Sequence, residues 1–180
     1  MMGLIIFYIL LTAYDRLYVN DYMLPRGTLR DLPSESRRAN AVVVTKCPST
    51  MQPIERRIVS NQLQLASYQH LCYSSVKYQA VDLPSTPLLV AGIANPEPLL
   101  VHLKKQYPKT HLLAFNDHHV FNKKDVQMIL DNAAHYACVV TTEKDYMRML
   151  HTPLIDKLAE KLIVLPMQTD LGVDKEVFDR

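Results

Sequence analysis

The chain has 180 residues, of which 48% are hydrophobic and 21% are charged, and its formal net charge is +2. This composition is typical of a folded globular core, with or without an added lobe, and excludes a disordered chain. The small charge and the lack of a basic stripe with interleaved aromatic residues give no indication of nucleic-acid binding. Three widely spaced cysteines, Cys47, Cys72 and Cys138, lie outside any CxxC pattern, so we predict neither a disulfide framework nor a zinc site. We therefore expect the protein to reside in a reducing cytoplasm.

The first apolar stretch, residues 2–13, is too short to span a bilayer, which takes roughly 20 apolar residues. It also lacks the basic segment and the small-residue cleavage site of a secretory signal. Its pattern predicts a central strand that is buried on both faces. Such a strand needs neighbours on both sides, so we expect a further part of the protein to precede it.

A loop with proline, glycine and two arginines follows at residues 23–33. Gly27 is expected to allow a bend with positive φ and a close approach of the backbone. Arg26 and Arg30 could bind a phosphate through bidentate hydrogen bonds. The alternative is a solvated loop whose arginines pair with carboxylates.

The rest of the chain alternates between strand and helix patterns. Strands are predicted at residues 41–46, 71–81, 88–92, 111–115, 136–142 and 162–166. Helices are predicted from residue 33, from residue 53, at 96–106, from residue 122, and at 146–150 and 153–161. The apolar stripe of the helix from residue 53 is predicted to contain Ile54, Ile58, Leu63 and Leu65. The tail after residue 166 shows little periodicity. This order predicts an α/β fold, a three-layer sandwich with a mostly parallel sheet and functional turns along its carboxyl edge.

One of these turns carries Asp117, His118 and His119 directly after a predicted strand. A carboxylate beside imidazoles suits acid–base chemistry, because histidine changes charge near neutral pH and a carboxylate fixes its tautomer. The alternative is that Asp117 only caps the following helix. Further polar residues are expected on the neighbouring turns, namely Asn95, Thr142, Glu143, Lys144 and Asp145. The sequence contains no GxxxxGK[ST] phosphate loop.

Several stretches in order resemble the tetraacyldisaccharide 4'-kinase family of lipid A biosynthesis: LPRGTLRD at 24–31, RANAVVVTK at 38–46, VAGIANPE at 90–97, FNDHH at 115–119 and VVTTEKD at 139–145. The resemblance covers the carboxyl-terminal portion of that family. It implies the carboxyl-terminal lobe of a P-loop-type lipid kinase. Residues 1–32 would then be a partial strand and a loop linking to a missing amino-terminal P-loop domain, and residues 33–180 a carboxyl-terminal α/β domain.

The family resemblance implies transfer of the γ-phosphoryl group of Mg-ATP to the 4'-hydroxyl of a lipid A disaccharide 1-phosphate precursor. The enzyme would act peripherally at the cytoplasmic face of the bacterial inner membrane. His118 matches the family histidine that pairs with the catalytic aspartate of the other half, and Asp117 would support it. Arg30 matches an arginine near the active-site cleft, with Arg26 as a second substrate-binding candidate. Residues 142–145 match a further family motif and, like Asn95, would have supporting roles.

The family places its ligands for ATP and Mg²⁺ mostly in the amino-terminal half, so we predict no metal ligands here and no activity of this chain alone. A possible partner is therefore an amino-terminal kinase half. One alternative is a non-catalytic lobe or remnant that packs on a partner through its apolar start. A less favoured alternative is a DHH-type metal-dependent phosphoesterase, which needs upstream aspartates that the strands ending near Lys46 and Gly92 do not supply.

Overall fold

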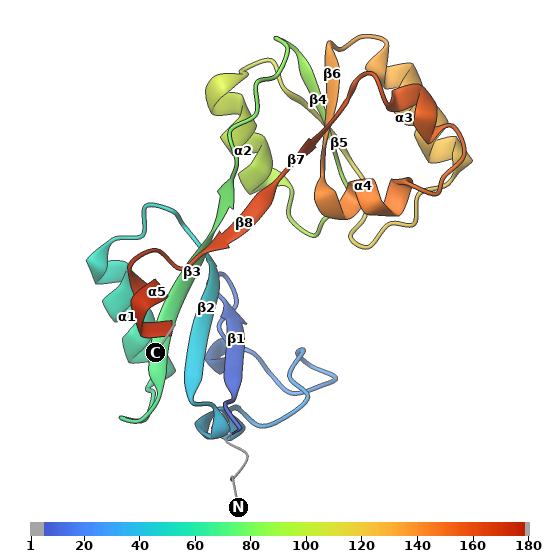
Figure 1. The fold of residues 1–180 in the computed structure, drawn as a ribbon. Helices are drawn as coiled ribbons and strands as arrows, with labels where there is room; N and C mark the ends of the chain where they lie inside the picture. Colours follow the sequence, from blue (N-terminus) through green and yellow to red (C-terminus); the bar gives the residue numbers. More distant parts are fainter. Residues whose placement is uncertain (1–5, 179–180) are drawn as a thin grey trace, which may run out of the picture. The chain divides into compact units, whose positions relative to one another are not determined.

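The computed structural model describes residues 6–178 and confirms the predicted α/β class (Figure 1). It contains two four-stranded sheets, and every strand pair with a described register is parallel. The chain forms two compact units, unit 1 (residues 1–77 and 169–180) and unit 2 (residues 78–168). The junction predicted at residue 32 concerns a link to another domain and stays a prediction.

Unit 1 is built on a sheet with the order β1-β2-β3-β8, although Tyr78 of β3 and Met167 and Gln168 of β8 fall within the range of unit 2. Its strands are β1 (Ile9–Ala13), β2 (Ala41–Cys47), β3 (His70–Tyr78) and β8 (Met167–Asp170). Its helices are α1 (Pro53–Leu63), the short α5 (Lys175–Phe178) and the 3-10 turns η1 (Tyr18–Asn20), η2 (Pro33–Arg38) and η4 (Gly172–Asp174). The helix predicted from residue 33 is thus a 3-10 turn.

The core of unit 1 forms where β2 meets α1. Val42 and Val44 alternate onto the face that packs against Val59 and Leu63 of the helix. The predicted inward position of Ile54 and Ile58 is wrong, because both side chains are exposed. The residues of the inward stripe are Val59 and Leu63, spaced by four, and the two isoleucines lie outside it.

Strand β1 corrects the prediction made for the apolar start of the chain. Residues 2–5 lie outside the described residues. Within the described part, β1 pairs only with β2 and therefore lies at the edge of its sheet. Leu11 is 64% exposed, and Ile9 is exposed as well, so the strand is not buried on both faces here.

The tail after residue 166, predicted to lack regular structure, instead forms β8, η4 and α5. Asp174 holds it to the rest of unit 1. Its carboxylate accepts hydrogen bonds from Arg56 Nη1 at 3.0 Å and from the backbone N–H of Tyr73 at 2.9 Å. Arg56 also lies over the Tyr73 ring, 4.8 Å from its centroid. These contacts link the tail to α1 and β3, which sequence periodicity could not indicate.

Unit 2 is built on a parallel sheet with the order β5-β4-β6-β7. Its strands are β4 (Pro87–Ala91), β5 (His111–Ala114), β6 (Cys138–Thr142) and β7 (Leu162–Leu165). Its helices are α2 (Glu97–Gln106), α3 (Lys123–Ala133), α4 (Glu143–Met149) and the 3-10 turn η3 (Ile155–Leu158).

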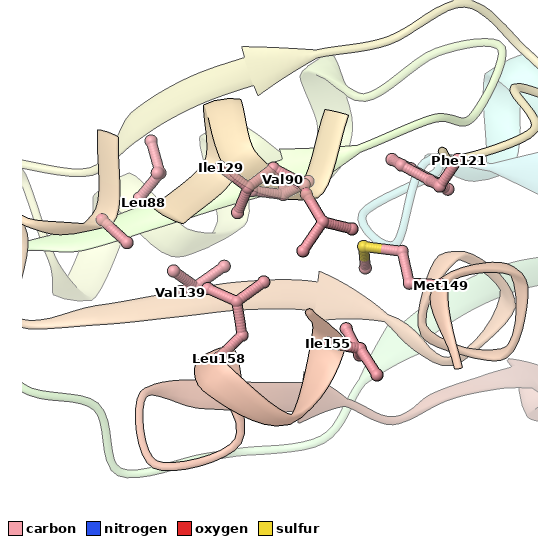
Figure 2. Close-up of a cluster of buried hydrophobic side chains, with 10 residues drawn as sticks. Leu88, Val90, Phe121, Ile129, Val139, Met149, Ile155 and Leu158 are labelled. Atoms are coloured by element: carbon pink, nitrogen blue, oxygen red, sulfur yellow. The ribbon is translucent and has the colours of Figure 1, made fainter. Parts of the chain in front are cut away.

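Alternate residues of β4 produce the predicted three layers in unit 2. Leu88 and Val90 face the cluster that holds α3 and Met149 of α4, as Figure 2 shows. Leu89 and Ala91 face the opposite cluster, which contains the buried leucines of α2. A central strand covered by helices on both faces reads as a continuous apolar run, and that pattern made β4 predictable.

Two boundaries in unit 2 differ from prediction. The helix expected at 153–161 shrinks to η3, because Leu154 adopts φ 76° and interrupts a regular helix. Helix α4 begins at Glu143, so the residues predicted as a charged turn form its first helical turn.

Candidate functional site

The centre of the candidate site is the buried carboxylate of Asp145, in the first turn of α4. Its Oδ2 accepts hydrogen bonds from the backbone N–H of Gly92 at 3.0 Å and from the Thr142 hydroxyl at 2.9 Å. The backbone N–H of Asp145 donates in return to Thr142 Oγ1 at 3.1 Å. Asp145 and Thr142 are fully buried, so together they tie the carboxyl ends of β4 and β6.

Arg148 extends this network to the surface, and the sequence analysis did not single it out. Its Nη1 donates to Asp145 Oδ1 at 3.1 Å and to the Gly92 carbonyl oxygen at 2.9 Å. Its Nη2 lies 3.1 Å from His118 Nδ1. The spacing of Asp145 and Arg148 on one helix could have indicated their ion pair, because residues three apart are neighbours on a helix surface.

His118 lies at the outer end of the network, after β5. Its φ is 58°, a left-handed conformation that is uncommon for residues other than glycine. Asp117 Oδ1 accepts from the His118 backbone N–H at 2.9 Å, and Asp117 Oδ2 lies 3.5 Å from His118 Nε2. The His118 side chain is 75% exposed. The turn therefore presents the imidazole to solvent while Arg148 contacts one of its nitrogens.

His119 contacts the first turn of α3. Its Nε2 lies 2.9 Å from Asp125 Oδ2, and its ring is packed between Phe115 and Phe121, with centroid distances of 4.9 and 5.0 Å. Burial favours a higher pKa for Asp125, but the hydrogen bonds from His119 and from the Asn122 backbone outweigh it and lower that pKa. His119 thus supports the turn structurally.

The alternative role for Asp117, capping the following helix, is wrong. Asn122 caps α3, because its Oδ1 accepts from the backbone N–H groups of Lys124 and Asp125. Asp125 completes the capping box by accepting from the Asn122 backbone at 2.8 Å. Asp117 instead accepts a hydrogen bond from the backbone N–H of its neighbour His118. The Asp117–His118 pair therefore takes no part in capping α3.

The other predicted turn residues have simpler local roles. Asn95 Oδ1 accepts from the backbone N–H of Glu97 at 3.2 Å and so helps to begin α2. Glu143 and Lys144 are exposed in the first turn of α4. Gly92 allows a close approach, because a Cβ there would lie 3.2 Å from Asp145 Oδ1. In residues 6–178, no three histidine, cysteine, aspartate or glutamate residues are grouped to hold a metal ion.

Arg26 and Arg30 belong to unit 1, on the predicted loop. Arg26 lies over the Tyr22 ring, 4.5 Å from its centroid. Arg30 is exposed and lines a groove of about 540 Å³ beside β1 and η2. Gly27 has no positive φ, so that prediction is wrong. The predicted close approach is confirmed, since a Cβ at Gly27 would collide with the Tyr22 backbone and the Asp21 carboxylate.

Asp21 supports the arginine loop. It accepts hydrogen bonds from the Thr28 hydroxyl and from the backbone N–H of Tyr22. These bonds, with that of Thr28 the stronger, hold the pKa of Asp21 below its usual range. Hydrogen bonds to Asp21 therefore connect the two ends of the turn at residues 22–28, and Arg26 and Arg30 are exposed on an ordered loop.

The family model described as tetraacyldisaccharide-1-P 4'-kinase matches residues 7–180 of this chain. The chain belongs to this family. It is 36% identical over 190 residues to the tetraacyldisaccharide 4'-kinase of Bacteroides thetaiotaomicron, covering 91% of the chain and 50% of that protein. The kinase of Flavobacterium johnsoniae is 37% identical over 185 residues, covering 96% of the chain and 52% of that protein. The kinase of Porphyromonas gingivalis is 30% identical over 187 residues, covering 93% of the chain and 52% of that protein.

The chain spans about half the length of these curated relatives of the tetraacyldisaccharide 4'-kinase family. The resemblance predicted from the sequence is thereby confirmed. Within unit 2, the structure brings Asp117, His118, Thr142 and Asp145 into one network through Arg148. No helix of the described residues is both long and apolar enough to cross a membrane.

Proposed function

We propose that this chain acts as the carboxyl-terminal part of a tetraacyldisaccharide 4'-kinase. The reaction would transfer the γ-phosphoryl group of Mg-ATP to the 4'-hydroxyl of the lipid A disaccharide 1-phosphate precursor. Family membership supports the reaction, and the share of the relatives that the chain covers supports a partial role. The observation that carries the proposal is the exposed His118 imidazole, fixed at the carboxyl edge of the sheet by Arg148 and Asp117.

The contribution of His118 would be to orient a carboxylate base. Phosphoryl transfer depends mainly on positioning and on neutralising charge, and a base must take the proton of the attacking hydroxyl. The His118 ring is exposed and its Nε2 lies at the long distance of 3.5 Å from Asp117, so that nitrogen can bind a carboxylate from another part of the enzyme. A carboxylate held in this way meets the substrate hydroxyl in one orientation.

The phosphates and the metal would be held mostly by another half of the enzyme. These 180 residues contain no GxxxxGK[ST] loop. Bound Mg-ATP supplies the phosphoryl group and neutralises the charge that develops on it. From this chain, the exposed Arg30 and Arg26 are suited to bind phosphate oxygens of the substrate. These residues alone would therefore transfer no phosphate.

The proposed site of action is the cytoplasmic face of the bacterial inner membrane, with the enzyme bound peripherally. The substrate carries acyl chains, so the enzyme has to reach a lipid surface. The lack of a membrane-spanning helix among the described residues is compatible with such binding.

The test is transfer of labelled γ-phosphate from Mg-ATP to the disaccharide 1-phosphate acceptor. The 180 residues are assayed alone and after addition of the amino-terminal half of the Bacteroides thetaiotaomicron kinase. We expect product only in the mixture, and a fall of about 100-fold with His118→Ala, the range for loss of an acid–base partner. His135→Ala, at an exposed histidine of the same unit, is the matched control and should keep the rate.

Two other results would contradict the proposal. Transfer by the 180 residues alone would mean that they hold a complete phosphate site. No transfer in either case would favour the non-catalytic lobe, for which the exposed Ile9 and Leu11 on the edge strand β1 provide an apolar surface.

A further inference from the structure

We propose that Arg148 is a positioning residue that fixes the tautomer of His118, with Nδ1 as the acceptor and the proton on the outward Nε2. The catalytic meaning of this assignment rests on the proposed function above. The assignment itself rests on the geometry of unit 2.

The donor inventory of the two side chains leads to the tautomer. Arg148 Nη2 lies 3.1 Å from His118 Nδ1, within hydrogen-bond distance. A guanidinium group has only donors and stays protonated in proteins, so Nδ1 has to accept. A neutral imidazole that accepts at Nδ1 carries its hydrogen on Nε2.

Arg148 can determine the tautomer of His118 because the Arg148 side chain is held in place more firmly than the His118 ring. Its Nη1 is held by Asp145 Oδ1 and by the Gly92 carbonyl oxygen, at 3.1 and 2.9 Å. Asp145 is itself fully buried and bound to the ends of two strands. The Arg148 side chain is 20% exposed, against 75% for His118. The rigid interior therefore orients the exposed ring.

An outward Nε2–H is the form that a carboxylate needs. A carboxylate only accepts when it is ionised, so a histidine that orients one must donate. Asp117 Oδ2 already lies on this side but at 3.5 Å, longer than a normal hydrogen bond. The Nε2–H of His118 is thus directed towards acceptors and is available to a carboxylate of the amino-terminal half.

The shape of arginine matters for this role. Arg148 contacts three acceptors at once, namely Asp145 Oδ1, the Gly92 oxygen and His118 Nδ1. Its planar fork supplies donors in fixed directions, whereas the ammonium group of lysine is a single point on a flexible stem. Arg148→Lys should therefore keep the ion pair with Asp145 but hold the His118 ring less well.

The tautomer is measured by long-range proton–nitrogen NMR correlation on the nitrogen-15-labelled chain at pH 8. His118 is assigned by the loss of its signals in His118→Gln, and the exposed His135 and His151 serve as internal references. We expect the ratio of the Nε2–H form to the Nδ1–H form of His118 to be about fivefold higher than in the references, the factor that a typical hydrogen bond supplies. Arg148→Met should remove this enrichment, and Arg148→Lys should restore part of it.

Lys123→Met is the matched control, because it removes an exposed cation of the same unit. It should leave the His118 tautomer unchanged. The wild-type spectrum is the first arm of the test and does not depend on Arg148→Met, a variant that leaves the buried Asp145 without its cation. If wild-type His118 populates the two tautomers as His135 and His151 do, the proposal is overturned. It is also overturned if a folded Arg148→Met chain keeps the wild-type ratio.

The kinase mixture provides a second readout that a merely structural role would not move. Arg148→Met should lower kcat by about tenfold, as expected for a misdirected acid–base partner, and leave the KM for Mg-ATP unchanged. Arg148→Lys should recover part of kcat. If the NMR result is as expected but His118→Ala keeps full activity, the proposed function fails while the tautomer assignment stands.

Discussion

Replacement of Asp145 by alanine tests the energetic importance of the network that connects β4, β6 and α4. The substitution removes the acceptor of three hydrogen bonds, from the Gly92 backbone, the Thr142 hydroxyl and Arg148. The Arg148 guanidinium and the Gly92 N–H then lose their charged partner where little water reaches them. Loss of an interior partner exposes the full desolvation cost of the groups left behind.

The magnitude follows from the burial of the pair. Asp145 is fully buried and Arg148 is 20% exposed. Removing one member of a buried ion pair costs about 3–5 kcal/mol, and a hydrogen bond to a charged group about 1.5–3 kcal/mol. We expect Asp145→Ala to lower the free energy of unfolding of unit 2 by about 4 kcal/mol, at the centre of the first range. That is a large share of the roughly 5–15 kcal/mol of a typical domain.

The measurement is urea unfolding, combined with hydrogen exchange of the β4 and β6 amides to locate the loss in unit 2. Asp131→Ala is the matched control, since that carboxylate is exposed on α3 and accepts a hydrogen bond from the Gln127 side-chain amide. The control should change the free energy of unfolding by less than about 0.5 kcal/mol. A loss below about 1 kcal/mol for Asp145→Ala would refute the reasoning, because such a pair would behave like an exposed one.

Three further expectations concern other parts of the chain. The pKa of Asp125 is lower in the folded chain than in the unfolded chain, where it is about 3.9. The stabilisation that the ionised Asp125 carboxylate provides should therefore be present above about pH 3.9 and be lost as the pH falls through the folded-state pKa. Asp125→Asn should flatten the acid side of a plot of the free energy of unfolding against pH. Burial raises the pKa of all three cysteines, so a thiol reagent at pH 8 should react with them in urea but not in the native chain, and rapid native labelling would contradict their burial. Met149→Ala should lower the free energy of unfolding by about 2–5 kcal/mol, measured in urea against Met147→Ala at an exposed site, and equal losses would refute its role in the core.

The sheet of unit 2 was predictable because its signals are local. The strand at residues 88–92 reads as an uninterrupted apolar run, and the structure places β4 at Pro87–Ala91 in the middle of the sheet. Helix α3 buries Val126 and Ile129 at the spacing that the sequence shows. Such patterns depend on a few adjacent residues and survive in the fold.

The connections of the site depend on distant segments and were harder to predict. The crowding of Asp117 and His118 after a strand was visible, and the structure confirms that position. Arg148 was missed because its contacts reach back 56 residues to Gly92 and 30 to His118. Only its helical spacing from Asp145 was visible in the sequence, and that spacing indicates one of its three partners.

Errors at the boundaries of unit 1 have a related cause. The apolar start suggested a central strand, but a strand's position in a sheet depends on its neighbours, and β1 has one described neighbour. The tail showed no periodicity because a single carboxylate, Asp174, anchors it. Hydrogen bonds to one side chain leave no repeating pattern in the sequence.

The order of the two units along the chain also determines when each can be completed during synthesis. Unit 2 is one continuous segment, residues 78–168, whereas unit 1 needs residues from both sides of it. Ribosomes add residues from the amino terminus, and domains fold as units once their segments are available. Unit 2 can therefore fold first, whereas the contacts of Arg56 and Tyr73 in unit 1 can form only after Asp174 has been synthesised.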